Sequence, residues 1–114
     1  MQYLLLIYGE ERVYENATRE QTNEIVAAFM AYSQALSDGK VLVASNRLRP
    51  TSAATTVRIA DGKTKVLDGP FAETKEQLAG YFLLEVPDME TALSWAKRHP
   101  TAAHGAVEVR PVWA

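Results

Sequence analysis

The sequence predicts an α+β domain in which two amphipathic helices cover one face of an antiparallel sheet. The chain has 114 residues, which is enough for one hydrophobic core. Apolar strand segments and helical segments follow each other in the order strand, helix, strands, strand, helix, strand. An Asp61-Gly62 pair between two alternating segments marks a tight turn. We therefore expect residues 1–114 to form a single domain.

Hydrophobic periodicity predicts the first strand and the first helix. Residues 2–8 are apolar on both alternating faces, which is typical of a strand with material on both sides of its sheet. Thr18 and Gln21 have the spacing of a capping box, and apolar residues then recur at intervals of three and four. The pattern stops before Gly39, so we predict a helix over residues 19–37.

A two-residue turn at Asp61-Gly62 determines the register of a hairpin between residues 55–60 and 63–68. One face of this hairpin is apolar and ends in Asp68, whereas the other face brings two like charges opposite each other. The predicted pairs are Ala60 with Lys63, Ile59 with Thr64, Arg58 with Lys65, Val57 with Val66, and Thr55 with Asp68.

The remaining elements complete the order. Residues 40–48 read as a strand that runs into a loop, and residues 81–86 as a strand that is apolar on nearly both faces. Asp88 can cap a helix that stops before Pro100, and residues 107–110 alternate as a last strand. Together these elements predict a ferredoxin-like βαββαβ fold with a hairpin insertion.

The second face of this sheet needs a cover. Two helices can cover only one face, whereas residues 2–8 and 81–86 are apolar on both faces. A second copy of the chain is the simplest cover. We therefore expect a homodimer whose sheets pack face to face.

The composition argues against several classes of function. With 12 Lys+Arg against 14 Asp+Glu, the chain has a formal net charge of −2 and no electrostatic footprint for nucleic acid or an anionic membrane. The absence of cysteine excludes disulfides, thiolate catalysis and cysteine-ligated metals. The apolar start of the chain lacks a basic segment and is too short to span a membrane. We expect a cytoplasmic protein without direct nucleic-acid contacts, and nothing in the sequence indicates a cofactor.

Histidine and serine offer little chemistry in this sequence. His99 and His104 are the only histidines, and no acidic residues stand near them at the spacing of metal ligands. We interpret both as surface residues of the loop after the second helix, and we predict no metal site. No serine lies in the context of a nucleophile elbow.

The densest group of chemically active side chains lies between residues 68 and 76, where three carboxylates and a lysine surround a Gly-Pro turn. A structural interpretation is that Asp68 accepts hydrogen bonds in a turn, Phe71 fills the core and the glutamates are solvated. A functional interpretation is that Asp68 and Glu73 or Glu76 line a cleft. Burial and mutual repulsion there would raise a carboxylate pKa toward the range of a general acid or base.

The same stretch resembles the DGPF branch of the YCII-related proteins, and the resemblance covers nearly the whole chain. It implies a ferredoxin-like fold that dimerises into an α/β barrel, and a role either as an enzyme or as an accessory protein of a regulatory system. Extracytoplasmic-function sigma factors are the partners that it implies, because such factors are often encoded beside DGPF proteins. The motifs are Asp68-Gly69-Pro70-Phe71-Ala72-Glu73-Thr74-Lys75-Glu76, Gly80-Tyr81, Ala92 with Trp95-Ala96, and Glu108-Val109-Arg110-Pro111-Val112.

The resemblance also implies a cleft with a His–Asp pair whose histidine lies on the first helix. In this sequence Phe29 stands at that position, and the predicted helix contains no histidine. The chain therefore departs from the family's acid–base pair.

Our leading hypothesis is that the protein binds or transforms a small polar molecule in a cleft beside residues 68–76. Asp68, Glu73 and Glu76 are the candidate catalytic residues. The candidate ligand-binding residues are Arg47 and Arg110 as anion contacts, Tyr8 and Tyr81 as hydrogen-bonding walls, Gly69 and Pro70 in the turn, and Phe71.

Two other hypotheses stay open. In the first, the protein is a non-enzymatic accessory module that docks on a sigma factor or another regulator through Phe71 and the acidic loop. Alternatively, the loop is purely structural, and substitution of Asp68 costs stability rather than binding.

Overall fold

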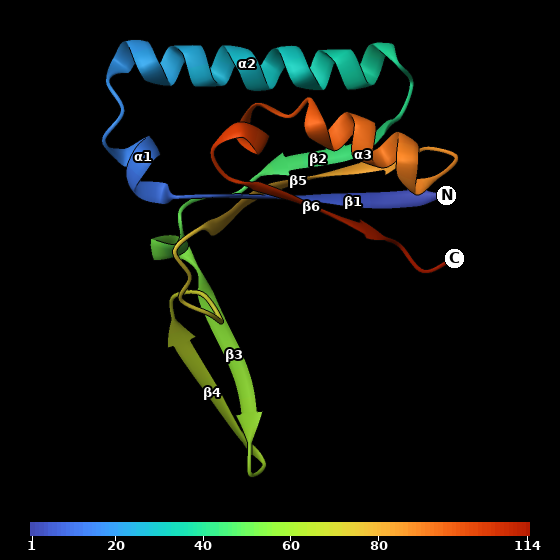
Figure 1. Ribbon diagram of the computed structural model, residues 1–114. Coiled ribbons are helices and arrows are strands. Elements are labelled where there is room, and N and C mark those ends of the chain that lie inside the picture. The colour runs from blue at the N-terminus through green and yellow to red at the C-terminus, as the bar shows by residue number, and fades with distance from the viewer.

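The computed structural model describes residues 1–114 and has two layers, a four-stranded antiparallel sheet and the helices on one of its faces (Figure 1). The strand order in this sheet is β2-β5-β1-β6, and β3 and β4 pair with each other in a separate two-stranded sheet. The predicted α+β class is confirmed, and the topology is consistent with a ferredoxin-like fold. The strands are β1 (Gln2–Gly9), β2 (Leu42–Arg47), β3 (Thr55–Ala60), β4 (Lys63–Asp68), β5 (Gln77–Glu85) and β6 (Ala106–Pro111); the helices are α1 (Glu11–Glu15), α2 (Arg19–Asp38) and α3 (Met89–Lys97), with short 3-10 turns η1 (Thr51–Ala53) and η2 (Pro100–Ala103).

The core lies between the sheet and the two longer helices. Alternate residues of the central strand β1 are buried, because its helix-facing side chains pack under α2 and α3 while the others point to the opposite face. α2 contributes only its inward stripe to this core. The buried core residues are Tyr3, Leu5, Ile7, Tyr32, Leu36, Phe82, Leu84, Val86, Ala92 and Ala96.

The helix starts follow the predicted capping chemistry. Thr18 Oγ1 accepts a hydrogen bond from the backbone N–H of Gln21 at 3.1 Å, and the Gln21 side chain accepts one from the Thr18 N–H at 2.9 Å. Asp88 Oδ1 accepts from the Thr91 N–H at 2.8 Å at the start of α3, and hydrogen bonds from Thr91 lower the pKa of Asp88. None of the helices is both long and apolar enough to cross a membrane.

β5 begins four residues earlier than the sequence predicts, at Gln77 instead of residue 81. Ala79 and Gly80 have low strand propensity, so local sequence gives no sign of a strand here. The strand forms here because it pairs with both neighbouring strands: Gly80 lies opposite Ile7 of β1 on one side and Arg47 of β2 on the other.

β3 and β4 form a hairpin that projects away from the four-stranded sheet, and we call residues 55–68 the arm (Figure 1). All five predicted pairs of the arm are present. Asp61 and Gly62 have φ of 51° and 74°, as a tight turn with two left-handed residues requires. The apolar face of the arm is exposed, with Ile59 at 74%.

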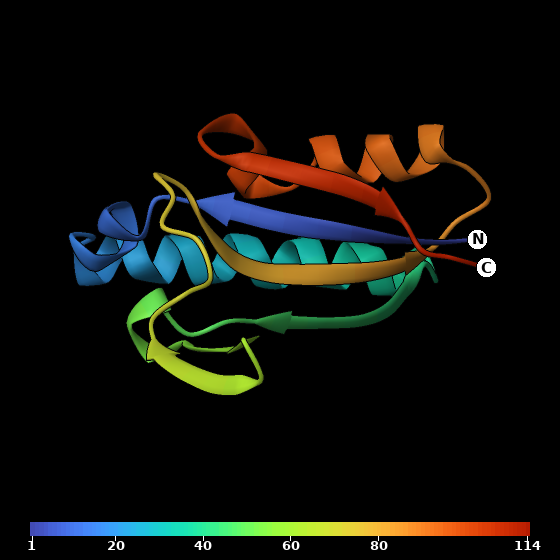
Figure 2. The same cartoon turned by 90° about the horizontal axis from the view of Figure 1, so that it is seen from below.

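The second face of the four-stranded sheet has no cover within the chain (Figure 2). Leu4 and Leu6 of β1 and Leu83 of β5 alternate with the buried residues of their strands and are half-buried. We call this surface the open face. It is the apolar second face that the two-faced strands predicted.

Candidate functional site

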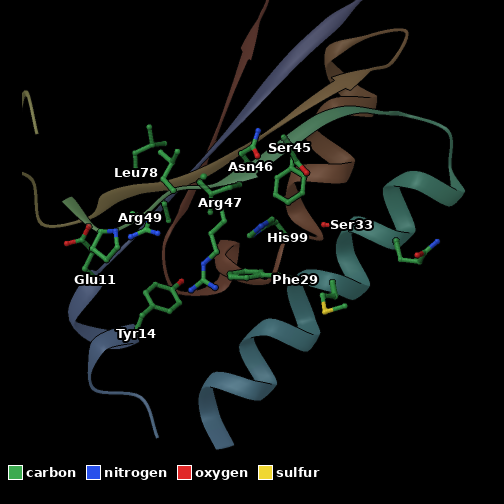
Figure 3. Close-up of a pocket in the computed structure, with 18 of the residues that line it drawn as sticks. Glu11, Tyr14, Phe29, Ser33, Ser45, Asn46, Arg47, Arg49, Leu78 and His99 are labelled. Atoms are coloured by element: carbon green, nitrogen blue, oxygen red, sulfur yellow. The ribbon is translucent and has the colours of Figure 1, made fainter. Parts of the chain in front are cut away.

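A pocket of about 440 Å³ lies between α2 and the sheet, beside the edge strand β2 (Figure 3). This volume lies in the range of sites that take a small organic molecule, roughly 300–1,000 Å³. The walls combine apolar and polar side chains from α1, α2, β2, β5 and the segments around residues 49 and 99. The pocket is therefore built from both layers of the fold.

Gly80 keeps the sheet side of the pocket free of a side chain. Gly80 lies in register between Ile7 and Arg47, and all three residues line the pocket. A Cβ atom at position 80 would lie 2.8 Å from the backbone oxygen of Asn46, so the close approach of β2 requires glycine here.

His99 lies against the inner wall of the pocket and is only 3% exposed. Three aromatic rings surround its imidazole. Their centroids lie 4.8 Å (Tyr32), 5.4 Å (Phe29) and 5.5 Å (Phe82) from that of His99. The interpretation of His99 as a surface residue is wrong. The segment after α3 folds back as η2, and His99, the N-cap residue of η2, is buried. His104 of the same segment is exposed, as predicted.

The protonation state of His99 follows from its surroundings. Its Nδ1 accepts a hydrogen bond from the Thr101 backbone N–H at 3.0 Å, so the proton of the neutral ring is on Nε2. Burial, and to a smaller extent the nearby His104, together lower the pKa of His99 to about 4. His99 is therefore a neutral hydrogen-bond donor at neutral pH.

Sequence reasoning missed His99 as a site residue, although one local signal was present. The N-cap of a helix often precedes a proline in the first helical position, and His99 precedes Pro100 of η2. The resemblance placed a histidine at Phe29 of α2. Phe29 packs on His99 in the structure, so the pocket does contain an imidazole, but the imidazole comes from the segment after α3.

Two arginines stand at the β2 side of the pocket. Figure 3 shows Arg47 reaching from the end of β2 toward Phe29 and Tyr14. Neither Arg47 nor Arg49 forms an ion pair within the chain. The carboxylate of Glu11 lines the same pocket, but its two oxygens accept the backbone N–H of Thr51 at 2.7 Å and the Thr51 hydroxyl at 2.8 Å. The guanidinium groups are thus free to meet a ligand.

The acidic residues singled out from the sequence do not line this pocket. Asp68 and Glu73 are exposed, and Glu76 is half-buried. Phe71 is 74% exposed and stacks under the Arg58 guanidinium at 5.1 Å, so the interpretation that it fills the core is wrong. Gly69 has a φ of 105°, which is a left-handed conformation that favours glycine, and the half-buried Pro70 follows it.

The other predicted ligand contacts lie on the open face. Arg110 forms an ion pair with Glu108, and the Tyr81 hydroxyl accepts a hydrogen bond from Asn46 Nδ2 at 2.8 Å. Tyr8 continues the open-face alternation of β1 and is half-buried. Of the predicted site residues, only Arg47 lines the pocket. No three acidic or histidine side chains gather as a metal-binding group.

The chain is similar to known sequences along its whole length. Residues 1–114 match the family model of the YCII-related domain. An uncharacterized protein of Rhizobium meliloti (strain 1021) is 37% identical over 114 residues, which cover 98% of this chain and 92% of the relative. The similarity therefore includes the sheet, the longer helices and the arm.

Proposed function

This chain belongs to the YCII-related family, and we propose that it binds a small anionic molecule in the pocket between α2 and β2. The observation that carries the proposal is the pair of guanidinium groups, Arg47 and Arg49, which line a cavity of about 440 Å³ without forming an ion pair in the chain. A guanidinium offers several donors in a planar fork and binds carboxylates and phosphates well.

The pocket strengthens such a contact. Arg47 and Arg49 are exposed, but apolar side chains, among them Phe29 and Phe82, form part of the lining and lower the dielectric on the inner side of a bound ligand. Arg47 starts from a strand rather than from a loop, because its backbone pairs with Gly80 of β5. The sheet therefore fixes the point from which the Arg47 side chain extends.

The test is isothermal titration calorimetry with a panel of small carboxylates and phosphates. We expect saturable binding by the wild type and at least a tenfold loss in R47Q, since a hydrogen bond to a charged group contributes about 1.5–3 kcal/mol. R19Q is the matched control, because Arg19 is exposed at the start of α2 and does not line the pocket. Unchanged affinity in R47Q, or no saturable binding at all, would overturn the proposal.

The acidic loop is a second part of the proposal. Asp68, Glu73 and Glu76 would act at the rim of the ligand site as acid–base or orienting groups. The loop lies next to Glu11, which lines the pocket. Gln77 follows the loop, and its Oε1 accepts a hydrogen bond from the backbone N–H of Glu11 at 3.0 Å. Within the loop, Lys75 Nζ lies 3.6 Å from Glu10 Oε1. We also assign the chain to the DGPF branch, which the Asp68-Gly69-Pro70-Phe71 run supports.

We further propose a homodimer in which the open faces pack together into an α/β barrel. The chain exposes 8187 Å², whereas a compact protein of 12.6 kDa exposes about 6,200 Å². Its radius of gyration is 16.0 Å, against about 13 Å for a compact domain of this length. The excess of about 2,000 Å² per chain matches what permanent dimers bury. The open face and the apolar face of the arm supply this surface, with the arm as the hairpin insertion.

A second candidate function is docking on a regulatory protein such as an extracytoplasmic-function sigma factor. The observation that favours it is the exposed ring of Phe71, which is covered on one side only by Arg58. Co-expression with a tagged sigma factor encoded beside the gene tests it. We expect recovery of the wild type and a clear loss in F71A, and recovery of the tagged factor alone would remove this candidate.

A further inference from the structure

We infer that the pocket ligand is a carboxylate that carries a second, uncharged carbonyl oxygen, with the carboxylate at Arg47 and the carbonyl oxygen at His99 Nε2. This inference rests on the proposed function and names the ligand class for the same pocket. It follows from three properties of the lining: the tautomer of His99, the rings around it, and the two arginines without intrachain ion pairs.

The tautomer of His99 provides a donor without an acceptor in the protein. The Thr101 N–H occupies Nδ1, which leaves the ring proton on Nε2. No group in the chain accepts this proton, and Nε2 is not sealed from the pocket that His99 lines. A ligand oxygen can accept from Nε2 there, in largely apolar surroundings where a hydrogen bond is stronger than in water.

The rings around His99 determine which kind of oxygen fits there. Phe29, Tyr32 and Phe82 surround the imidazole and leave it in a poorly solvated position. An anionic oxygen would lose its hydration there, and the imidazole opposite it is neutral. A carbonyl oxygen needs only one hydrogen bond and carries no net charge, so it suits the inner position.

The charged end of the ligand belongs at the other side of the pocket. Arg47 and Arg49 line that side and are free of intrachain ion pairs. Among the acidic residues of the lining, Glu11 already accepts two hydrogen bonds from Thr51, and Glu15 is exposed, as are Arg47 and Arg49. The two guanidinium groups therefore supply charged donors on this side, which favours the carboxylate of a ligand there.

The sheet side of the pocket also carries apolar side chains, Ile7 and Phe82. Such side chains can pack against an aromatic ring. Keto acids that carry an aryl group beyond the carbonyl therefore make suitable probes. Phenylpyruvate and benzoylpropionate place the carbonyl at two different distances from the carboxylate, and phenylpropionate and phenylbutyrate are their matched analogues without the carbonyl.

The experiment measures the affinity of these four probes by calorimetry for the wild type and H99N. Asparagine keeps a side-chain acceptor near the Thr101 N–H, as an N-cap, but removes the Nε2 donor. We expect at least one keto acid to bind the wild type tenfold or more tightly than its analogue. In H99N this preference should fall to nearly one, with the affinity of the analogue unchanged. Benzoylpropionamide, which lacks the negative charge, should bind at least tenfold more weakly than benzoylpropionate.

The possible results separate this inference from the proposed function. Saturable binding of all four acids without any preference for the carbonyl would overturn the inference and leave the proposed function standing. Tight binding of the amide would overturn the carboxylate assignment. Absence of binding by every acid would overturn the inference, and the wider panel of carboxylates and phosphates then decides the proposed function. If H99N does not fold, NMR of the wild-type imidazole nitrogens decides: the Nε2 resonance should shift with the keto acids only, and equal shifts with both classes would overturn the inference.

Discussion

At the scale of single residues, His99 combines a structural and a chemical role. It caps η2 through Nδ1, packs among three rings, and turns its remaining nitrogen to the pocket. Burial in this position lowers the pKa of His99 to about 4, compared with 6.5 for an unperturbed histidine. The folded protein therefore resists protonation at a site where the unfolded chain accepts a proton.

This difference predicts a pH dependence of stability. Between about pH 6.5 and pH 4 the unfolded chain binds a proton at this position and the folded chain does not, so the contribution of His99 is complete above pH 6.5 and is lost as the pH falls toward 4. The full loss is on the order of 3 kcal/mol. Urea unfolding at about pH 7 and about pH 5 measures the part lost by pH 5, which is about 2 kcal/mol. H99N should show a clearly shallower dependence, and an identical dependence would contradict the assigned burial.

Asp68 tests the acidic loop at the same scale. It is exposed and forms no ion pair, so we expect D68N to change the free energy of unfolding by no more than about 0.5 kcal/mol. On the proposed role at the rim of the site, the same variant should alter the affinity for the carboxylate probes, because it removes a charge near the bound anion. D61N, in the hairpin turn, is the control. Unaltered binding in D68N would remove this residue from the site, and a large loss of stability would support the purely structural hypothesis.

At the scale of elements, the arm has too few contacts of its own to be self-sufficient. An isolated two-stranded hairpin is marginally stable in water. At the base of the arm the flanking residues extend the hairpin: the Gly69 N–H donates to the Ala54 backbone oxygen at 2.7 Å, and the Thr56 hydroxyl donates to the Gly69 backbone oxygen at 2.8 Å. Beyond this base the apolar face of the arm is exposed, and the proposed dimer would supply a surface to cover it.

The arm therefore yields a matched pair of variants. Ile59 lies on the apolar face, and its neighbour Ala60 lies on the opposite face. If the apolar face packs on a second copy, I59D should shift the protein from dimer to monomer, whereas A60D should remain dimeric. Sedimentation velocity distinguishes the two species. A dimeric I59D would show that the arm does not contribute to the interface.

At the scale of the whole molecule, the flat shape predicts that folding and association are linked. The principal extents are 47 × 42 × 19 Å, and one broad side is the uncovered sheet. If a second copy covers this side, the dimer is the stable form and its melting temperature rises with protein concentration. Calorimetry over a hundredfold range of concentration checks this. A melting temperature that does not change would contradict the dimer proposal.

Local sequence determined the elements whose stability depends on near neighbours. The capping box of Thr18 and Gln21 predicted the start of α2, and the Asp61-Gly62 turn predicted every pair in the arm that was specified. Residues 2–8, which are apolar on both faces, also predicted an apolar second face of the sheet that the helices leave open. These features depend on backbone geometry and periodicity over a few residues, which a single sequence displays directly.

Only the tertiary structure decided the candidate site. His99, Phe29 and Arg47 are far apart in the sequence, and no spacing rule connects the segment after α3 with α2 and β2. The early start of β5 likewise depends on strands that pair with Gly80 from both sides. The sequence favoured the acidic run at residues 68–76 as a site because its charged residues are adjacent in the chain. A pocket, by contrast, arises where packed layers leave space, and that space depends on contacts between residues distant along the chain.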